Sequence, residues 1–115
     1  MRPDEDYLRD MLRALDSIER FARGADAVSF ASDELRQAAI LQRLTTIGEA
    51  VARLSPATRA RAPRVPWARI VAFRNQAVHA YFAVDWDFVW GVVRRRLPAL
   101  RRRIEPLLRE LEADR

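Results

Sequence analysis

Residues 7–21, YLRDMLRALDSIERF, decide the fold class of this 115-residue chain. Apolar side chains recur there every three or four positions, which is the spacing of an amphipathic helix. They are Leu8, Met11, Leu12, Leu15, Ile18 and Phe21. The helix is expected to end near Gly24, because glycine commonly terminates helices. Since no stretch of useful length alternates like a β-strand, the pattern predicts an all-α protein.

A second helix is predicted from Ser32 to the Ser55-Pro56 pair, with Asp33 and Glu34 in its first turn. Its apolar stripe consists of Ile40, Leu44, Ile47, Val51 and Leu54. Ala38, Leu41 and Gly48 lie off that stripe. They form a narrower second face, which would let the helix touch a partner as well as its own core.

Two further helices complete the expected bundle. Residues 55–66 contain three prolines and are predicted to be irregular, and Pro66 then opens a short third helix. A long last helix is expected from about Asp85, with an apolar stripe formed by Val89, Val93, Leu97, Leu100, Ile104, Leu107 or Leu108, and Leu111. Pro98 should kink this helix without dividing it, because the stripe stays in register on both sides. The fold expected for residues 1–115 is one domain, a bundle of about four helices.

The composition excludes several kinds of chemistry. The chain has no Cys, one His (His79), and 21 basic residues that are all Arg. A Schiff-base lysine, a catalytic thiol and a Cys/His zinc site within one chain are therefore excluded. Proton transfer near neutral pH must use His79 or a strongly perturbed carboxylate or tyrosine. No apolar run is long enough to cross a bilayer and the first residues are acidic, which predicts a soluble, cytoplasmic protein without membrane contact.

Charge is distributed unevenly along the chain. Residues 1–49 hold seven Arg and ten acids, whereas residues 50–115 hold fourteen Arg and six acids. No acid occurs between Glu49 and Asp85, and the triplets Arg94-Arg95-Arg96 and Arg101-Arg102-Arg103 follow seven residues apart. A seven-residue spacing stacks the two triplets along one helix. The basic half is expected to attract a polyanion or an acidic surface, although the triplets alone could be a solvated helix face.

The segment RNQAVHAY, residues 74–81, is not explained by packing. On a continuous helix Arg74 and His79 differ by about 140° in direction, so they would not share a face. The two side chains can converge only if the helix ends between them. We therefore expect Arg74 at the end of the third helix and His79 and Tyr81 in an extended turn before the fourth.

The pattern R-x-x-x-x-H-x-Y, formed by Arg74, His79 and Tyr81, resembles the motif of the HEPN superfamily of small helical RNases, and within it the HepT toxins. The flanking residues resemble the same family over nearly the whole chain. They are Ile47-Gly48-Glu49-Ala50, Pro66-Trp67, Ile70, Asn75 and Leu97-Pro98.

The resemblance implies a HEPN-like homodimer with the motifs gathered at the dimer cleft. It implies a toxin of a type VII toxin–antitoxin system that cleaves or processes RNA without a metal or other cofactor. Arg74 and His79 would be catalytic, and Asn75 would be a supporting polar contact. Tyr81 would accept AMP from an MntA-type nucleotidyltransferase antitoxin, which would neutralise the toxin and could form a larger hetero-oligomer with it. The RNA could be messenger or transfer RNA.

The chemistry of these residue types agrees with RNA cleavage by the ribose 2′-OH. That reaction needs a base at the hydroxyl, an acid at the leaving oxygen and positive charge at the phosphate. An imidazole suits the proton transfers, and a guanidinium suits the phosphate. One His per chain is one short of a separate acid and base, and a two-fold dimer would supply the second. A single His acting twice, or through water, is the alternative.

Two other functions remain open from the sequence. The chain could be a non-catalytic HEPN-like module that binds nucleotide or a nucleotidyltransferase partner, or a helical dimer that binds nucleic acid through the Arg triplets alone. Glu49 is expected to be structural, with a hydrogen bond inside the bundle. Trp67, Trp86 and Trp90 are expected in core and interface packing, not in base stacking.

Overall fold

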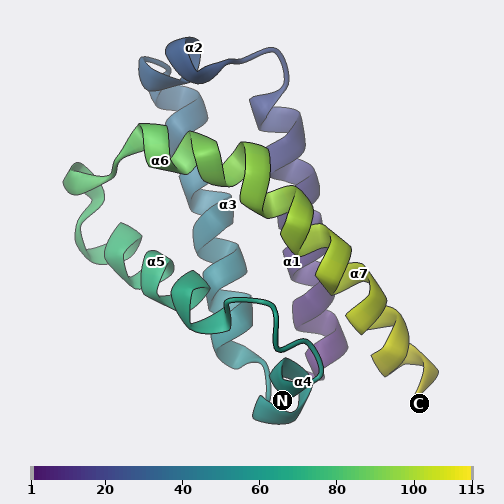
Figure 1. Cartoon of the computed structure of the whole chain (residues 1–115). Helices are drawn as coiled ribbons and strands as arrows, with labels where there is room; N and C mark the ends of the chain where they lie inside the picture. Colours follow the sequence, from purple (N-terminus) through teal and green to yellow (C-terminus); the bar gives the residue numbers. More distant parts are fainter. Residues whose placement is uncertain (1, 115) are drawn as a thin grey trace.

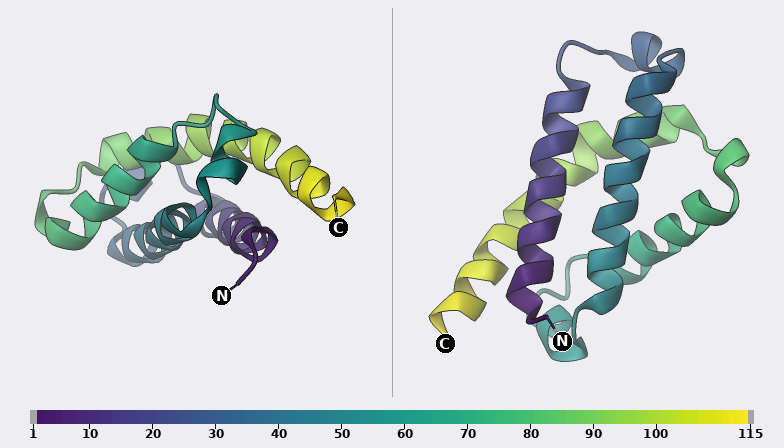
Figure 2. Two further views of the ribbon diagram at one scale, coloured as in Figure 1. Left: turned by 90° about the horizontal axis from the view of Figure 1, so that it is seen from below. Right: turned by 180° about the vertical axis from the view of Figure 1, so that it is seen from behind.

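The protein folds into two layers of helices (Figures 1 and 2). The computed structural model describes residues 2–114, and no strand occurs among them. Helices α1 (Asp4–Ala22) and α3 (Glu34–Arg53) form one layer as an antiparallel pair. The other layer holds α5 (Trp67–His79) and the long path of α6 (Trp86–Gly91), η2 (Val92–Arg96) and α7 (Leu97–Ala113). This arrangement confirms the predicted all-α bundle of about four main helices with a long C-terminal helix.

The core lies where the α6–α7 path crosses α1 and α3. The largest fully buried side chains come from all of these helices and from the short α2 (Ala27–Ala31): Phe30, Leu8, Met11, Ile18, Ile40, Ile47, Ile104, Leu107, Val51 and Val89. The ring of Phe30 packs 5.0 Å from Trp90 and 5.9 Å from Trp86, centroid to centroid. Trp67 and Trp90 are buried and Trp86 is partly buried against the core, which confirms the core packing predicted for the tryptophans.

The turn between the first two long helices is close to the prediction. Helix α1 ends at Ala22 and Gly24 has a φ of 81°, a value that favours glycine. The Arg36 guanidinium donates hydrogen bonds to the carbonyl oxygens of Phe21 and Arg23, and so satisfies the end of α1. The N-cap of α3 is Asp33 and not Ser32, because the Asp33 carboxylate accepts a hydrogen bond from the Arg36 amide.

The connection predicted to be irregular contains a short helix, α4 (Pro56–Ala60). Ser55-Pro56 ends α3, as expected, and also starts α4, because the Ser55 hydroxyl accepts from the Thr58 amide and Pro56 fits the first turn. The Asp4 carboxylate accepts hydrogen bonds from the hydroxyls of Ser55 and Thr58 and from the Ser55 amide. Burial tends to raise the pKa of Asp4, but these hydrogen bonds outweigh it and leave the pKa below its ordinary value.

The long last helix is irregular just before Pro98. Residues Val92–Arg96 form a π-helical segment, and the Leu97 amide bonds to the Val92 carbonyl five residues back. Pro98 cannot donate to the carbonyl of Arg94, and its ring would crowd that carbonyl in an α-helix. The wider π turn relieves this conflict, and the helical path continues past Pro98 undivided, as predicted. The predicted kink at Pro98 itself stays a prediction. Pro106 also lies within α7.

Among residues 2–114, no helix is both long and apolar enough to cross a membrane.

Candidate functional site

Arg74 lies where α5 comes closest to α3. A Cβ atom built on Gly48 of α3 would overlap the Arg74 Cβ and would lie 2.7 Å from the Arg74 Cγ. It would also lie 3.4 Å from the carbonyl oxygen of Ile70. The missing side chain at Gly48 therefore lets the stem of Arg74 rest on the backbone of α3. The Arg74 Nε is buried and has no hydrogen-bond partner among residues 2–114.

This contact explains the second apolar face predicted on the α3 segment. Leu41 and Gly48, which lie off the main stripe, are both buried, and the residue that covers Gly48 is Arg74 of the same chain. Ala38 is exposed. Around Gly48, this second face of α3 therefore packs against α5. The sequence analysis placed Gly48 on this second face and among the residues flanking the motif, but did not pair it with Arg74. A glycine in the middle of a helix was the signal that a close contact would be found there.

The prediction that the third helix ends between Arg74 and His79 is wrong. Helix α5 continues through His79 and is closed by a 2.8 Å hydrogen bond from the Ala80 amide to the Gln76 carbonyl. The next residues are not extended, because Tyr81–Ala83 form a 3-10 turn, η1. Neither Gly nor Pro occurs from Arg74 to His79, so no helix breaker interrupts the backbone hydrogen bonds there.

As a consequence, one chain does not bring Arg74 and His79 onto one face. Five residues of continuous α-helix separate their directions by about 140°. Arg74 faces α3, whereas His79 is exposed on the outer side of α5. Asn75 is also exposed, one helical turn before His79. Within residues 2–114, neither His79 nor Asn75 makes a side-chain hydrogen bond or ion pair.

Tyr81 lies on the outside of the molecule beside two other aromatic rings. Its side chain is 45% exposed, and its ring lies 5.7 Å from Phe82 and 6.4 Å from Trp86, in edge-to-face geometry. Phe82 is fully exposed. The phenol of Tyr81 is therefore accessible to another molecule. The sequence analysis did not predict an exposed apolar ring next to the motif.

Glu49 does not have the structural role expected of it. It is exposed on α3 and makes no hydrogen bond or ion pair with another residue of the range 2–114.

The arginines divide into an ion-paired group and an unpaired group. The ion-paired group consists of Arg2, Arg9, Arg13, Arg36, Arg61 and Arg101. In the triplets, Arg101 pairs with Asp16 and Glu19 of α1, whereas Arg94, Arg95, Arg96, Arg102 and Arg103 are exposed. Arg96 and Arg103 line one pocket and Arg94 and Arg101 line another, as a seven-residue spacing predicts.

Within the same range, no group of three or more His, Asp or Glu side chains is arranged to hold a metal ion.

A two-layer helical bundle that places an R-x-x-x-x-H-x-Y motif at the end of one helix and in the following turn defines a HEPN-like domain. The family described as "Ribonuclease HepT-like" matches residues 11–107. A relative from Thermococcus cleftensis named "Probable ribonuclease HepT" is 33% identical over 106 residues, which are 92% of this chain and 96% of the relative. No solved structure matches the chain.

Two further relatives carry the name "Putative RNase". One, from Methanocaldococcus jannaschii, is 28% identical over 92% of this chain and 91% of its own length. The other, from Caldanaerobacter subterraneus, is 26% identical over 96% of this chain and 98% of its own length. The chain belongs to the HepT-like ribonuclease family.

Proposed function

We propose that the protein is the toxin of a type VII toxin–antitoxin system and cleaves RNA without a metal, through attack of the ribose 2′-OH on the adjacent phosphate. The 2′-oxygen forms a bond to phosphorus, the bond to the 5′-oxygen breaks, and the products end in a 2′,3′-cyclic phosphate and a 5′-hydroxyl. Membership in a ribonuclease family, with the motif side chains of Asn75, His79 and Tyr81 exposed, supports this proposal. DNA lacks the nucleophile and is not cut.

Arg74 stabilises the negative charge that develops on the phosphate. A guanidinium is always charged and donates paired hydrogen bonds to an oxyanion. The contact with Gly48 fixes the stem of the side chain, and a preorganised donor stabilises a transition state better than a mobile one. Asn75 supports the substrate as an exposed polar contact on the next position of α5.

His79 transfers the protons, and a second copy of the chain completes the site. Arg74 and His79 point in different directions from α5, so a single chain does not form the site. A two-fold interface brings the same patch of both protomers together, and so places two histidines and two arginines around one cleft. The outer side of α5 suits this contact, because its exposed residues Ala68, Asn75 and Val78 are uncharged.

Tyr81 is the point of control. A nucleotidyltransferase antitoxin transfers AMP from ATP to the exposed phenol oxygen, and pyrophosphate leaves. The added phosphodiester is negative and lies two residues from His79. It therefore opposes binding of the RNA phosphate by repulsion and by bulk.

The experiment that tests this function is RNA cleavage by purified wild-type protein with a chelator present. His79→Ala should lower the rate about 10²- to 10⁴-fold and Arg74→Ala about 10²- to 10³-fold. Arg95→Ala, an exposed arginine on the α6–α7 path, should cleave normally. An oligonucleotide with a single ribose should be cut only at that ribose. If the wild type cuts no RNA but binds a nucleotidyltransferase partner, the chain is a non-catalytic module instead.

A further inference from the structure

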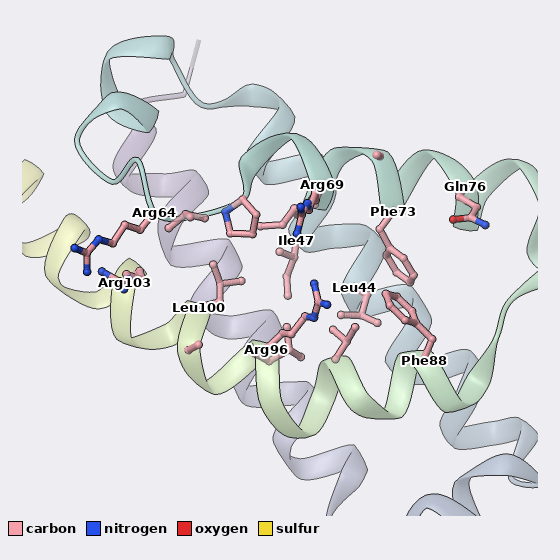
Figure 3. Close-up of a pocket in the computed structure, with 17 residues that line it drawn as sticks. Leu44, Ile47, Arg64, Arg69, Phe73, Gln76, Phe88, Arg96, Leu100 and Arg103 are labelled. Atoms are coloured by element: carbon pink, nitrogen blue, oxygen red, sulfur yellow. The ribbon is translucent and has the colours of Figure 1, made fainter.

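A groove separates α5 from the α6–α7 path within the second layer (Figure 3). It has a volume of about 730 Å³ and lies between α5 and the α6–α7 path, over α3 (Figure 3). Phe73 and Phe88 face each other near one end with their ring centroids 6.2 Å apart, and Arg64 and Arg103 lie together at the other. His79, Tyr81 and Arg74 do not line this groove, so it is distinct from the proposed catalytic site. We call it the arginine groove.

The rim of the arginine groove carries uncompensated positive charge. Arg64, Arg69, Arg96 and Arg103 line it, and no Asp or Glu of residues 2–114 does. None of the four arginines forms an ion pair within that range, and only Arg96 has a side-chain partner there, the ring of Phe88 at 5.8 Å. By contrast Arg101, on the other side of α7, is neutralised by two acids of α1. The groove therefore carries four arginines and no acidic side chain of residues 2–114 to neutralise them.

The floor of the groove is apolar and mostly aliphatic. It includes Leu44 and Ile47 of α3, Ile70 of α5, and Leu97 and Leu100 of α7. Aliphatic side chains on a partner cover such a floor well, whereas nucleobases prefer to stack on aromatic rings or guanidinium planes. The two aromatic rings of the lining, Phe73 and Phe88, face each other, and in Figure 3 they lie between Arg96 and Gln76. The lining thus favours a protein over RNA.

A second copy of this chain fits the groove poorly. A two-fold interface through the groove would bring its four arginines against the same four arginines of the other copy, and like charges placed together oppose association.

The groove runs along the α6–α7 path from Phe88 to Arg103, which is roughly 20 Å at 1.5 Å per residue, the length of a helix of about 14 residues.

We propose that the arginine groove is a docking site for an acidic amphipathic helix of a partner protein. Leucine or isoleucine side chains from one face of that helix enter between α5 and α7. Glutamates or aspartates on both flanks pair with the four rim arginines. This helix-in-groove mode buries the apolar floor and neutralises the rim in one step. It does not depend on the RNA-cleaving activity proposed above.

The test uses a labelled 14-residue helical peptide with leucines on one face and glutamates on its flanks. A matched peptide carries lysines in place of the glutamates. Fluorescence anisotropy with the full-length protein should show saturable binding of the acidic peptide and none of the basic one. His79→Ala should bind the acidic peptide like the wild type, so a failure of RNA cleavage leaves this result interpretable.

Two kinds of variant place the peptide in the groove. Arg69→Glu/Arg96→Glu should weaken binding at least about tenfold, since it removes two pairs and adds two repulsions. Arg95→Glu/Arg109→Glu makes the same change in net charge at exposed residues outside the groove and should have little effect. Ala99→Trp, at an exposed position of the lining, should block binding, whereas Ala52→Trp on the exposed side of α3 should not.

Several results would overturn the proposal. Equal binding of both peptides would show that charge does not select the ligand. Equal loss in the two arginine pairs would show that the groove is not the site. If Ala99→Trp instead changed the sedimentation of the protein alone, a second copy would occupy the groove. If the groove variants lost RNA binding and kept the peptide, the groove would belong to the RNA path.

Discussion

Arg74 of α5 rests on Gly48 of α3, and a single added carbon at Gly48 would overlap the side-chain stem of Arg74. The overlap involves the Cβ and Cγ of Arg74, which cannot move far without moving α5 itself. Arg74, Asn75 and His79 lie on α5, and Tyr81 follows two residues after its end. The packing of two helices therefore sets the position of the proposed site. The contact also keeps the Arg74 Nε away from water.

Gly48→Ala should destabilise the fold and impair RNA cleavage together. Overfilling a tight contact costs about 1–3 kcal/mol, measurable as a lower free energy of unfolding in urea. Gly91→Ala is the matched control, because a Cβ there meets mainly the flexible end of Arg95, with the nearest atom, Nη2, 2.8 Å away. Alanine favours the helix, so Gly91→Ala should be neutral or stabilising by up to about 1 kcal/mol. Equal effects of the two substitutions would show that the Gly48 contact has no special role.

Periodic apolar residues predicted the main helices well, and the helix ends less well. The stripes through residues 7–21 and 40–54 became α1 and α3, since each buries a continuous face of side chains. The Ser55-Pro56 pair was used only as a stop, yet the same pair has the chemistry of an N-cap followed by a first helical residue. The π segment before Pro98 depends on how the chain resolves a steric conflict, which periodicity does not reveal.

The candidate site residues could be proposed from the sequence, but their relative placement could not. The spacing of Arg74, His79 and Tyr81 indicated a motif. Their convergence within one chain was inferred from the needs of the chemistry, and the continuous helix contradicts it. A helix continues unless a local residue stops it, and none between Arg74 and His79 does so. The arginine groove was invisible as well, because α5 and α7 approach each other only in the folded chain.

Mixed dimers should show whether each cleft needs two histidines. Wild-type and His79→Ala chains, unfolded together and refolded at equal amounts, form dimers at random. If both histidines of a cleft are required, as we expect for a separate acid and base, activity falls to about a quarter of the all-wild-type value. If one histidine acts alone, about half remains. Native mass spectrometry checks that the chains have mixed, and an active monomer in sedimentation would contradict the shared cleft altogether.

Tyr81 should be the acceptor of AMP, and Tyr7 provides a matched control because it is the only other tyrosine of the chain. Tyr7 lies on α1, partly buried against the core, with Arg2 over its ring at 4.8 Å. With ATP labelled at the α-phosphate and the nucleotidyltransferase partner, label should enter the wild type and Tyr7→Phe, and not Tyr81→Phe. Label retained by Tyr81→Phe would place the modification on another side chain and remove this mode of control.

Asp4 should make the stability of the protein depend on pH under acidic conditions. Its pKa in the folded protein lies below the ordinary value of 3.8, because hydrogen bonds from Ser55 and Thr58 outweigh the effect of burial. The folded state therefore favours the charged carboxylate, and this stabilisation is fully present above about pH 4. It is lost as the pH falls through the lower folded-state pKa. Asp4→Asn should thus reduce the free energy of unfolding by about 1–2 kcal/mol at pH 7. Urea unfolding across the acidic range should show the variant and the wild type converging as the pH falls.

Glu49→Gln, at an exposed carboxylate with no partner among residues 2–114, should change stability by less than about 0.5 kcal/mol at any pH. A constant gap between Asp4→Asn and wild type down to the lowest pH would mean that the carboxylate acts through its shape and not through its charge.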